Sequence, residues 1–314
     1  MGLLHRIRGR AAMASGDFDH LFRKVEVPPL PAATVRLLKE INLPEPDPQR
    51  LARVIGGTPE LAAKVLQLVN SSFFALRRPV STIQHAVSLV GPGQIRPLAL
   101  GFTMASAVPR PASGPFDHEA FWTDSLHRAL LARAFAREGG AGDADEAFTA
   151  MLLADLAVPV LLRAWAEPYA PVVDEWKGSG ERLSALERRV LGWSHAEAGA
   201  WILGRWKLPA PLIDLAGAHV LPPDSLRETG IVEASPLAVA LAALAPSVLR
   251  PDAARVGRMV EEVKTHLGLG AEAFLCRART VAGELEEIRG LFRLRDRGAA
   301  GLLTENAAFG VATP

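Results

Sequence analysis

Residues 148–157 read Phe-Thr-Ala-Met-Leu-Leu-Ala-Asp-Leu-Ala, an apolar run that contains one carboxylate, that of Asp155. Alanine and leucine favour helix over strand, so the run predicts a buried helix. Burying an ionised aspartate costs several kcal/mol unless a partner replaces its lost hydration. Asp155 is therefore expected to face a polar cavity or to meet partners from elsewhere in the chain.

The composition of the whole chain also favours helices. Its 314 residues are enough for about two domains, and 49% of them are hydrophobic while only 6% are aromatic. The core must therefore be mostly aliphatic, which suits closely packed helices better than sheets. The net charge of +1 gives no electrostatic sign of a nucleic-acid or membrane partner. The only cysteine, Cys276, fits a reducing cytosol and is expected to pack as a small hydrophobe.

No membrane span or signal peptide is expected. An uninterrupted apolar run of about 18 residues is absent, and the nearest candidate, residues 236–245, stops at Pro246. The basic first ten residues lack the apolar core of a signal peptide. We therefore expect a cytoplasmic protein whose residues 1–24 form a tail or leading helix.

In the first third of the chain, the pattern predicts short helices with tight connections. Residues 32–41 carry an apolar stripe, Asp47 is placed to cap the next helix, and Thr58 followed by Pro59 begins a third. The proline-rich residues 109–115 have the composition of a joint between two subdomains. No period-two alternation lasts long enough to support a sheet, so the predicted class is all-α.

Two capping boxes mark helices in the second half. The Asp and Glu of residues 143–146 start the central helix, which Pro159 is expected to kink or end. The Ser and Glu of residues 194–197 start another helix and place His195 in its first turn. A further helix ends at His219. These two histidines are the best available partners for the buried carboxylate.

The last predicted helix, residues 272–294, has apolar residues at alternating four- and three-residue steps. They are Phe274, Ala278, Val281, Leu285, Ile288 and Phe292. The seam is shorter than a coiled coil usually needs, so we expect it to dock on the chain's own domain, although an oligomer could form through it. Residues 298–314 are expected to be a tail.

The order of several motifs resembles the N-terminal half of the HDOD domain family, a group of bacterial, all-helical signalling modules related to HD-type phosphohydrolases. The motifs are Leu30-Pro31, Pro59-Glu60-Leu61-Ala62, Leu66-Gln67-Leu68-Val69-Asn70-Ser71, Arg77-Arg78-Pro79-Val80-Ser81, Ile83, Ala86 and Gly91. One departure is Thr58, where the family usually has Asp. Because Thr caps a helix nearly as well as Asp, we expect this change to be mild.

The resemblance covers residues 25–250 and implies a two-part helical domain. Residues 25–110 correspond to an N-terminal helical subdomain and residues 116–250 to a degenerate HD-like subdomain. Residues 251–297 follow as C-terminal helices.

HD-type phosphohydrolases hold divalent ions with a His, an adjacent His-Asp pair, further His residues and a late Asp, all from separate helices. The resemblance places these ligand positions, in order, at Asp124, Ala154-Asp155, His195, His219-Val220 and Ala243. Ala154 and Ala243 offer methyl groups where ligands should be. The resemblance therefore implies a site degraded below catalysis, with no metal and no cofactor. Asp155, His195 and His219 stay weak metal candidates and otherwise form a polar cluster.

The favoured function is a non-catalytic bacterial signal-transduction module that binds a partner protein or a nucleotide. Its partner is expected to be a sensor, a cyclic-dinucleotide enzyme or a regulator, and Asn70, Ser71, Arg77 and Arg78 are the candidate partner or ligand surface. The alternative is a metal-dependent phosphohydrolase or phosphodiesterase with a reduced site.

Two other classes of function fit the sequence poorly. A serine hydrolase triad of Ser194, His195 and Asp155 would lack its Gly-x-Ser-x-Gly elbow. Nucleic acid is not expected, because Arg77 and Arg78 have no aromatic stacking platform beside them.

Overall fold

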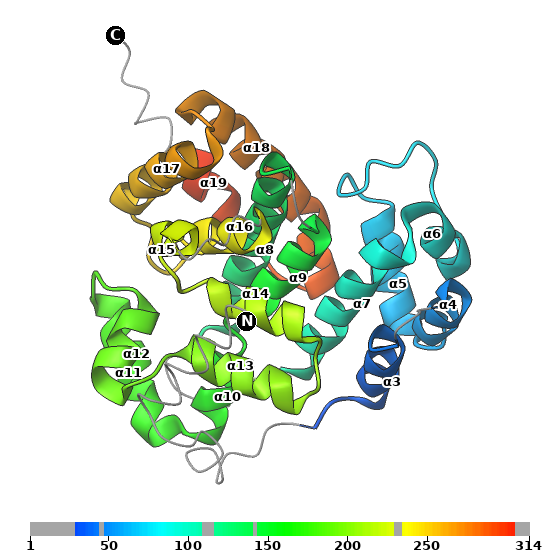
Figure 1. The fold of residues 1–314 in the computed structure, drawn as a ribbon, viewed down its shortest axis with the longest axis horizontal. Coiled ribbons are helices and arrows are strands. Elements are labelled where there is room, and N and C mark those ends of the chain that lie inside the picture. Colours follow the sequence, from blue (N-terminus) through cyan, green and yellow to red (C-terminus); the bar gives the residue numbers. More distant parts are fainter. Residues whose placement is uncertain (1–28, 44–46, 109–115, 141–142, 229–233, 305–314) are drawn as a thin grey trace.

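The regular secondary structure is helical throughout the part of the chain that the computed structural model describes (Figure 1). Apart from helices, these residues form only one isolated bridge, between Ser247 and Arg250. The described residues are 29–43, 47–108, 116–140, 143–228 and 234–304. The all-α prediction is confirmed for them. The predicted N-terminal tail and the joint at 109–115 lie outside the described residues.

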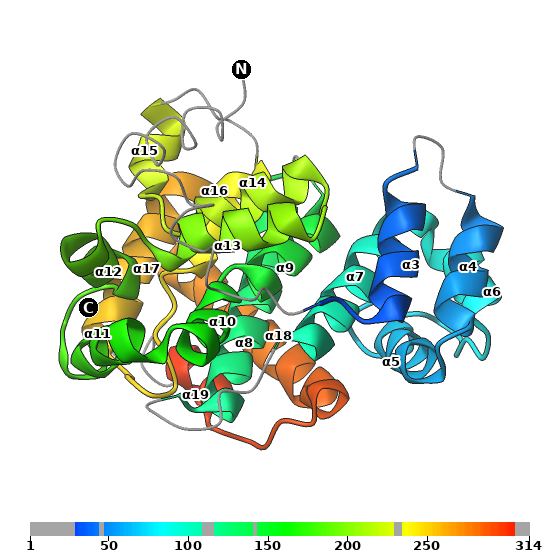
Figure 2. The ribbon, with the colours of Figure 1, turned by 90° about the horizontal axis from the view of Figure 1, so that it is seen from below.

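A smaller lobe contains the first helices, and Figure 2 shows it projecting beside the rest of the molecule. Its helices are α3 (Ala32–Ile41), α4 (Pro48–Gly56), α5 (Pro59–Val69) and α6 (Ile83–Val90). Helix α7 (Pro92–Ala107) packs on these helices and also on the central helix α9, so it joins the smaller lobe to the larger one.

The caps of this lobe confirm one expectation and correct another. Asp47 caps α4, because its Oδ1 accepts the backbone N–H of Gln49 at 2.8 Å. Thr58 occupies the N-cap of α5, but its side chain makes no capping hydrogen bond. The expectation that its hydroxyl replaces an Asp cap was therefore wrong. Pro59 at the first helical position, where a missing N–H costs nothing, is the stronger start signal.

The larger lobe is built around α8 (His118–Glu138), α9 (Ala144–Leu153) and α16 (Ala234–Ala242), which pack on one another (Figure 1). The helices between α9 and α16 are α10 (Ala157–Ala164), α11 (Ala166–Gly178), α12 (Leu183–Leu191), α13 (His195–Arg205), α14 (Ala210–Ala218) and α15 (Pro223–Glu228). Helix α9 also contacts α7 and α14, so helices surround it on several sides. Gly101 of α7 allows one of these approaches, since an added Cβ would lie 3.2 Å from Leu152 Cδ2.

The central helix ends earlier than predicted. Helix α9 stops at Leu153, residues 154–156 form a turn, and α10 begins at Ala157. Pro159 was expected to end the helix, but it lies in the first turn of α10, where its missing N–H has no helical partner to lose. The earlier break places Asp155 in a turn, where a carboxylate can leave the apolar core.

The C-terminal helices are α17 (Ala253–Leu267) and α18 (Ala271–Ile288), followed by the 3₁₀ turn η1 (Arg289–Phe292) and α19 (Ala299–Thr304). The predicted docking of α18 is confirmed, because it packs on α8 of the same chain and buries its seam from Phe274 to Ile288. Two expectations are corrected. Cys276 lies exposed on α18, and the predicted tail begins instead with α19, which buries Ala299 and Leu303.

One stretch, Ala144–Ala164, is long and apolar enough to resemble a membrane span by composition. Helices α9 and α10 share it, and 83% of its most apolar window is buried inside the fold. Its apolar side chains therefore have a partner in the protein's own core.

Candidate functional site around Asp155

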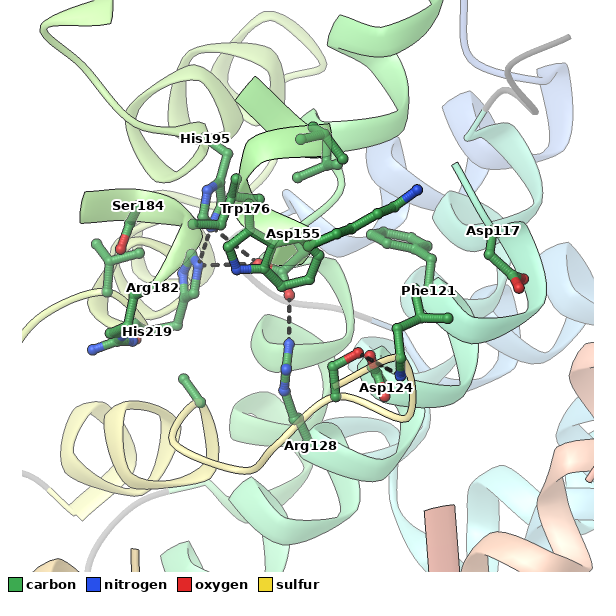
Figure 3. A pocket seen from close by; sticks show the side chains of 18 of the residues that line it. Asp117, Phe121, Asp124, Arg128, Asp155, Trp176, Arg182, Ser184, His195 and His219 are labelled. Atoms are coloured by element: carbon green, nitrogen blue, oxygen red, sulfur yellow. Dashed lines mark hydrogen bonds and ion pairs between the residues drawn. The ribbon is translucent and has the colours of Figure 1, made fainter. Parts of the chain in front are cut away.

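Asp155 meets both histidines that the sequence proposed as its partners (Figure 3). Its Oδ1 lies 3.1 Å from His195 Nε2 and 3.2 Å from His219 Nε2. The two Nε2 atoms are themselves 2.9 Å apart. The turn after α9, the first residue of α13 and the C-cap of α14 therefore bring three polar side chains to one point.

Two acceptors fix the orientation of the imidazole rings. His195 Nδ1 donates to Glu187 Oε2 at 2.6 Å, and the same oxygen accepts the His195 backbone N–H at 2.8 Å. Glu187 is fully buried on α12, and its other oxygen accepts the Tyr169 hydroxyl at 2.5 Å. His219 Nδ1 donates to the Ala216 carbonyl at 2.6 Å. Both Nε2 atoms consequently point toward Asp155.

A proton on His195 balances the negative charge of Asp155. Burial by itself would raise the pKa of Asp155, but the hydrogen bond from His195 Nε2 and the close approach of the His219 ring hold it well below the usual 3.8. Burial would lower the pKa of His195, but Glu187 and Asp155 outweigh burial and raise that pKa to about 10. Burial keeps the pKa of His219 below its usual 6.5. At neutral pH the site therefore holds a carboxylate at Asp155, an imidazolium at His195 and a neutral His219.

An arginine takes the second oxygen of Asp155. Arg128 Nη1 donates to Asp155 Oδ2 at 3.2 Å, and its Nη2 donates to the Ala245 carbonyl at 3.2 Å. Ala245 lies just after α16 and two residues beyond Ala243, where the sequence resemblance led us to expect the late Asp. The guanidinium thus ties the turn after α9 to the end of α16.

Asp124 is not brought into the histidine cluster. Its Oδ1 accepts the Val248 backbone N–H at 2.9 Å, and Ser247 also hydrogen-bonds to its carboxylate. Figure 3 shows it beside the loop that follows α16. Burial raises its pKa above the usual 3.8. Of the degraded positions, Ala154 is buried in the turn before Asp155, and Ala243 lines the cavity described below.

The predicted partner surface lies on the smaller lobe, away from this cluster. The Asn70 side chain pairs with the backbone of Val80: its Nδ2 donates to the Val80 carbonyl at 2.8 Å, and its Oδ1 accepts the Val80 N–H at 2.7 Å. Ser71 Oγ donates to the Leu68 carbonyl at 2.7 Å. These two side chains shape the loop between α5 and α6. Arg77 and Arg78 are exposed on that loop, so the surface stays a prediction that depends mainly on them.

Sequence reasoning missed Arg128, Glu187 and Tyr169. They come from α8, α12 and α11, and their spacing in the chain marks none of them as a site residue. Glu187 carries a usable signal, because it lies next to Leu186 and four residues after Leu183, on the buried face of α12. The Ser194–Glu197 capping box forms as predicted and fixes the start of α13.

HD-type enzymes hold a divalent ion. Three side chains of this chain, Asp155, His195 and His219, could supply part of the coordination shell of such an ion. Neighbouring ligands of an octahedral ion with bonds of about 2.1 Å lie about 3.0 Å apart, close to the separations among Asp155, His195 and His219. Metal-bound histidines also donate their other N–H to a carboxylate or carbonyl, as both rings do. These residues could hold one ion, which would supply an activated water.

The remaining positions do not fit a second ion. Arg128 occupies the other oxygen of Asp155, and Asp124 is bonded to the loop after α16. The first ion would also have to displace the proton from His195, whose pKa is about 10, and each unit above the working pH costs roughly 1.4 kcal/mol. In the described part of the chain, the imidazolium of His195 and the guanidinium of Arg128 supply the positive charge beside Asp155.

Comparison with known proteins agrees with this architecture. A family model of the HDOD domain matches residues 27–222, well over half of the chain. The chain belongs to the HDOD domain family. The matched residues of this HDOD protein include Asp124, Asp155, His195 and His219, whereas Ala243 lies beyond them.

The relatives are distant. An uncharacterized protein of Treponema pallidum (strain Nichols) is 23% identical over 199 residues, which are 62% of this chain but only 37% of that protein. An HDOD domain protein of unknown function from Geobacter sulfurreducens superposes with a TM-score of 0.66 at 20% identity, covering 94% of this chain and 99% of its own. A candidate phosphohydrolase from Shewanella amazonensis SB2B superposes with a TM-score of 0.61 at 22% sequence identity. The match covers 91% of this chain and 97% of that protein's chain. At these identities the likeness establishes the fold.

Proposed function

We propose that this HDOD chain is a regulatory module that binds a signalling partner or ligand and does not hydrolyse it. The observation that carries the proposal is the Arg128 bridge between Asp155 and the Ala245 carbonyl, at 3.2 Å to each. In a metal-dependent hydrolase, an ion would link helices at such a point and activate water. A guanidinium supplies the positive charge and the link, but it has no open coordination position for water.

The methyl groups at Ala154 and Ala243 support the same proposal. They stand where HD-type enzymes place a His and an Asp, and a lost ligand costs more than the 10–100-fold attributed to changes around the ligands. The expected setting is bacterial signal transduction, with a sensor, a cyclic-dinucleotide enzyme or another regulator as the partner protein.

A phosphoester panel tests the absence of catalysis. We expect purified protein supplied with Mn²⁺, Fe²⁺ or Mg²⁺ to form no more hydrolysis product than the Asp155→Asn variant does. The products to measure are phosphate from nucleotides, p-nitrophenol from p-nitrophenyl phosphate, and linear dinucleotide from cyclic dinucleotides. Asn keeps the shape of the side chain and removes the carboxylate that any ion here would need. Metal-dependent turnover that disappears in Asp155→Asn would overturn the proposal.

A second function, that of a reduced metal-dependent phosphohydrolase, is favoured by one specific observation. Asp155, His195 and His219 place three ligand atoms within 4.8 Å of one another, and both rings are held by their Nδ1 partners. Elemental analysis of protein purified without chelator separates the two functions. The regulatory reading expects less than one equivalent of iron, manganese, nickel or zinc, whereas a stoichiometric ion lost in His219→Gln would support the enzyme.

A further inference from the structure

The Asp155 cluster forms part of the wall of a cavity of about 120 Å³ between α8, α11 and α17. Four cationic side chains line this cavity, namely Arg128, Lys177, Arg182 and Arg255. Helices α8, α11 and α17 and the segment before α12 contribute one each. The cavity is therefore basic although the whole chain has a net charge of only +1.

The carboxylates of the wall do not neutralise this charge, because each is already bound. Asp117 pairs with Arg297 at 2.9 Å. Asp124 accepts hydrogen bonds from the loop after α16, and Asp155 is shared by two histidines and Arg128. Lys177 lies 3.7 Å from Asp174, and Arg128 is the partner of Asp155, so these two cations are also paired. The lining still places three carboxylates against four cationic side chains and the His195 imidazolium, which leaves an excess of positive charge on the cavity wall.

Among the four cations of the cavity, Arg182 is the one without a carboxylate partner in the described part of the chain. It donates to the His219 carbonyl at 2.8 Å, and no carboxylate lies within ion-pair distance of it among the described residues. Arg255 Nη2 donates to the carbonyls of Gly180 and Glu181, at 3.0 and 3.1 Å, and its Nε lies 3.5 Å from Asp252, so none of these contacts uses its Nη1. Burial lowers the pKa of Arg182, the charges of Arg128 and Arg255 lower it further, and the Asp155 carboxylate opposes them in part. Cations this close repel one another unless an anion lies between them.

Aromatic rings border the same space. Trp176 of α11 and Phe121 of α8 both line the cavity (Figure 3). The Arg250 guanidinium lies 5.0 Å from the centroid of the Trp176 ring and holds the indole in place. Convergent cations beside flat apolar rings are the features that bind a phosphate and a planar ring together.

From this juxtaposition we propose that the cavity together with its open mouth binds a small phosphorylated molecule with a flat ring, of the nucleoside monophosphate class. A cavity of about 120 Å³ is too small to enclose a whole nucleotide, so part of the ligand lies in the mouth, exposed to solvent. The phosphate lies against Arg182 and Arg255, and the ring packs on Trp176 and Phe121. This inference rests on the proposed function, because it names the kind of molecule that a non-hydrolysing module would bind. The side chains assigned to the phosphate and the ring are not among the three candidate metal ligands, although those ligands line the same cavity.

Isothermal titration calorimetry of the full chain in the presence of EDTA tests the inference without any metal. The probes are 5′-GMP and 5′-AMP, with ribose 5-phosphate, guanosine and inorganic phosphate as partial ligands. We expect at least one nucleotide to bind about tenfold or more tightly than every partial ligand. No binding by either nucleotide at millimolar concentration would overturn the inference, and equal affinity for ribose 5-phosphate would overturn the role of the rings.

Matched arginine variants on α17 locate the phosphate. Arg255→Gln is expected to weaken nucleotide binding by about 10- to 100-fold, since a charged hydrogen bond to phosphate is lost. Arg258→Gln, one turn further along the same helix at an exposed position, is expected to leave the affinity unchanged. Equal effects of the two substitutions would contradict the site. Arg182→Gln gives a second test of the same contact. If Arg182→Gln does not fold, the comparison of Arg255→Gln with Arg258→Gln decides.

A ring variant and a turnover assay complete the test. Trp176→Leu is expected to weaken the nucleotide by about tenfold and to leave the affinity for ribose 5-phosphate unchanged; an equal loss for both would contradict ring packing. If a bound nucleotide is hydrolysed once metal replaces EDTA, the proposed regulatory function fails and the binding inference stands. If nothing binds and nothing is hydrolysed, the binding inference fails and the regulatory function stands.

Discussion

Helix α8 carries two ion-paired arginines, five residues apart, that serve different ends. Arg133 has a side chain only 1% exposed and binds Asp145 and the Phe73 carbonyl, both at 2.8 Å, with its guanidinium 3.2 Å from the Phe73 ring. Arg128 is 16% exposed and binds Asp155 and the Ala245 carbonyl at 3.2 Å, beside the cavity. We name these the closed cluster (Arg133, Asp145, Phe73) and the open cluster (Arg128, Asp155, His195, His219).

The difference shows how burial assigns a role to the same residue type. The closed cluster links the larger lobe to the loop after α5, and its charges have no access to solvent. Such a pair adds little net stability over an apolar substitute, but breaking it strands a charge. In the open cluster, Arg128 and Asp155 are each 16% exposed at the cavity, so water or a ligand can reach these two charges, whereas the histidines behind them are buried.

The largest expected effect comes from breaking the closed cluster. Arg133→Met leaves the Asp145 carboxylate buried without its partner, and we expect a loss of about 3–5 kcal/mol in the free energy of unfolding. Urea unfolding followed by circular dichroism measures it. Arg137→Met, one turn later at an exposed position, is the control and should change little.

The double variant Arg133→Met with Asp145→Leu sharpens this test. It removes both charges of the Arg133–Asp145 pair and leaves only the Glu284 carboxylate, which lies 3.8 Å from Arg133 Nη1 and is partly exposed, without that partner. We therefore expect it to recover most of the stability lost in Arg133→Met. If the double variant is as unstable as the single one, packing and the Phe73 contact, rather than the stranded charge, dominate the closed cluster.

The next effect is a pH dependence that belongs to the open cluster. The pKa of His195 is raised from the usual 6.5 to about 10, so the folded protein keeps this proton where the unfolded chain has lost it. Its stabilising contribution is complete below pH 6.5 and is lost as the pH rises toward 10, with a slope of up to about 1.4 kcal/mol per pH unit. Urea unfolding at pH 7, 8 and 9 measures this slope.

Two carboxylate variants assign the slope to its cluster. Asp155→Asn removes a charge that raises the pKa of His195 and should flatten the slope, whereas Asp145→Asn in the closed cluster should leave it unchanged. A site that holds a metal would behave in the opposite way, because the ion competes with the proton and stabilises more as the pH rises. Stability that increases from pH 7 to 9 with added Mn²⁺ would therefore contradict the proton-based cluster.

The smallest effect is expected for Arg128→Met. Asp155 keeps the imidazolium of His195 and access to solvent, so the loss should be about 1–2 kcal/mol, well below that of Arg133→Met. Both variants measured side by side in urea test the comparison directly. Equal losses would mean that the open cluster is as closed to water as the other.

Several features of the site could be predicted because they depend on neighbours in sequence. The capping box at 194–197 places His195 at a helix start, and Asp155 in an apolar run requires partners from elsewhere. The break after Leu153 was predicted too late, because proline is a strong signal even where it only begins the next helix. Thr58 shows the same limit, since a favourable cap residue need not make the bond.

The amino-acid sequence by itself determined the helical class, most helix starts and the pairing of Asp155 with two histidines, because periodicity, caps and the cost of burying a charge act locally. Only the tertiary structure decided that Arg128 takes the second oxygen of Asp155, that Glu187 orients His195, and that Arg182 and Arg255 face one cavity. These contacts join helices far apart in the chain. Their geometry is set by how the helices pack, and residue spacing carries no record of it.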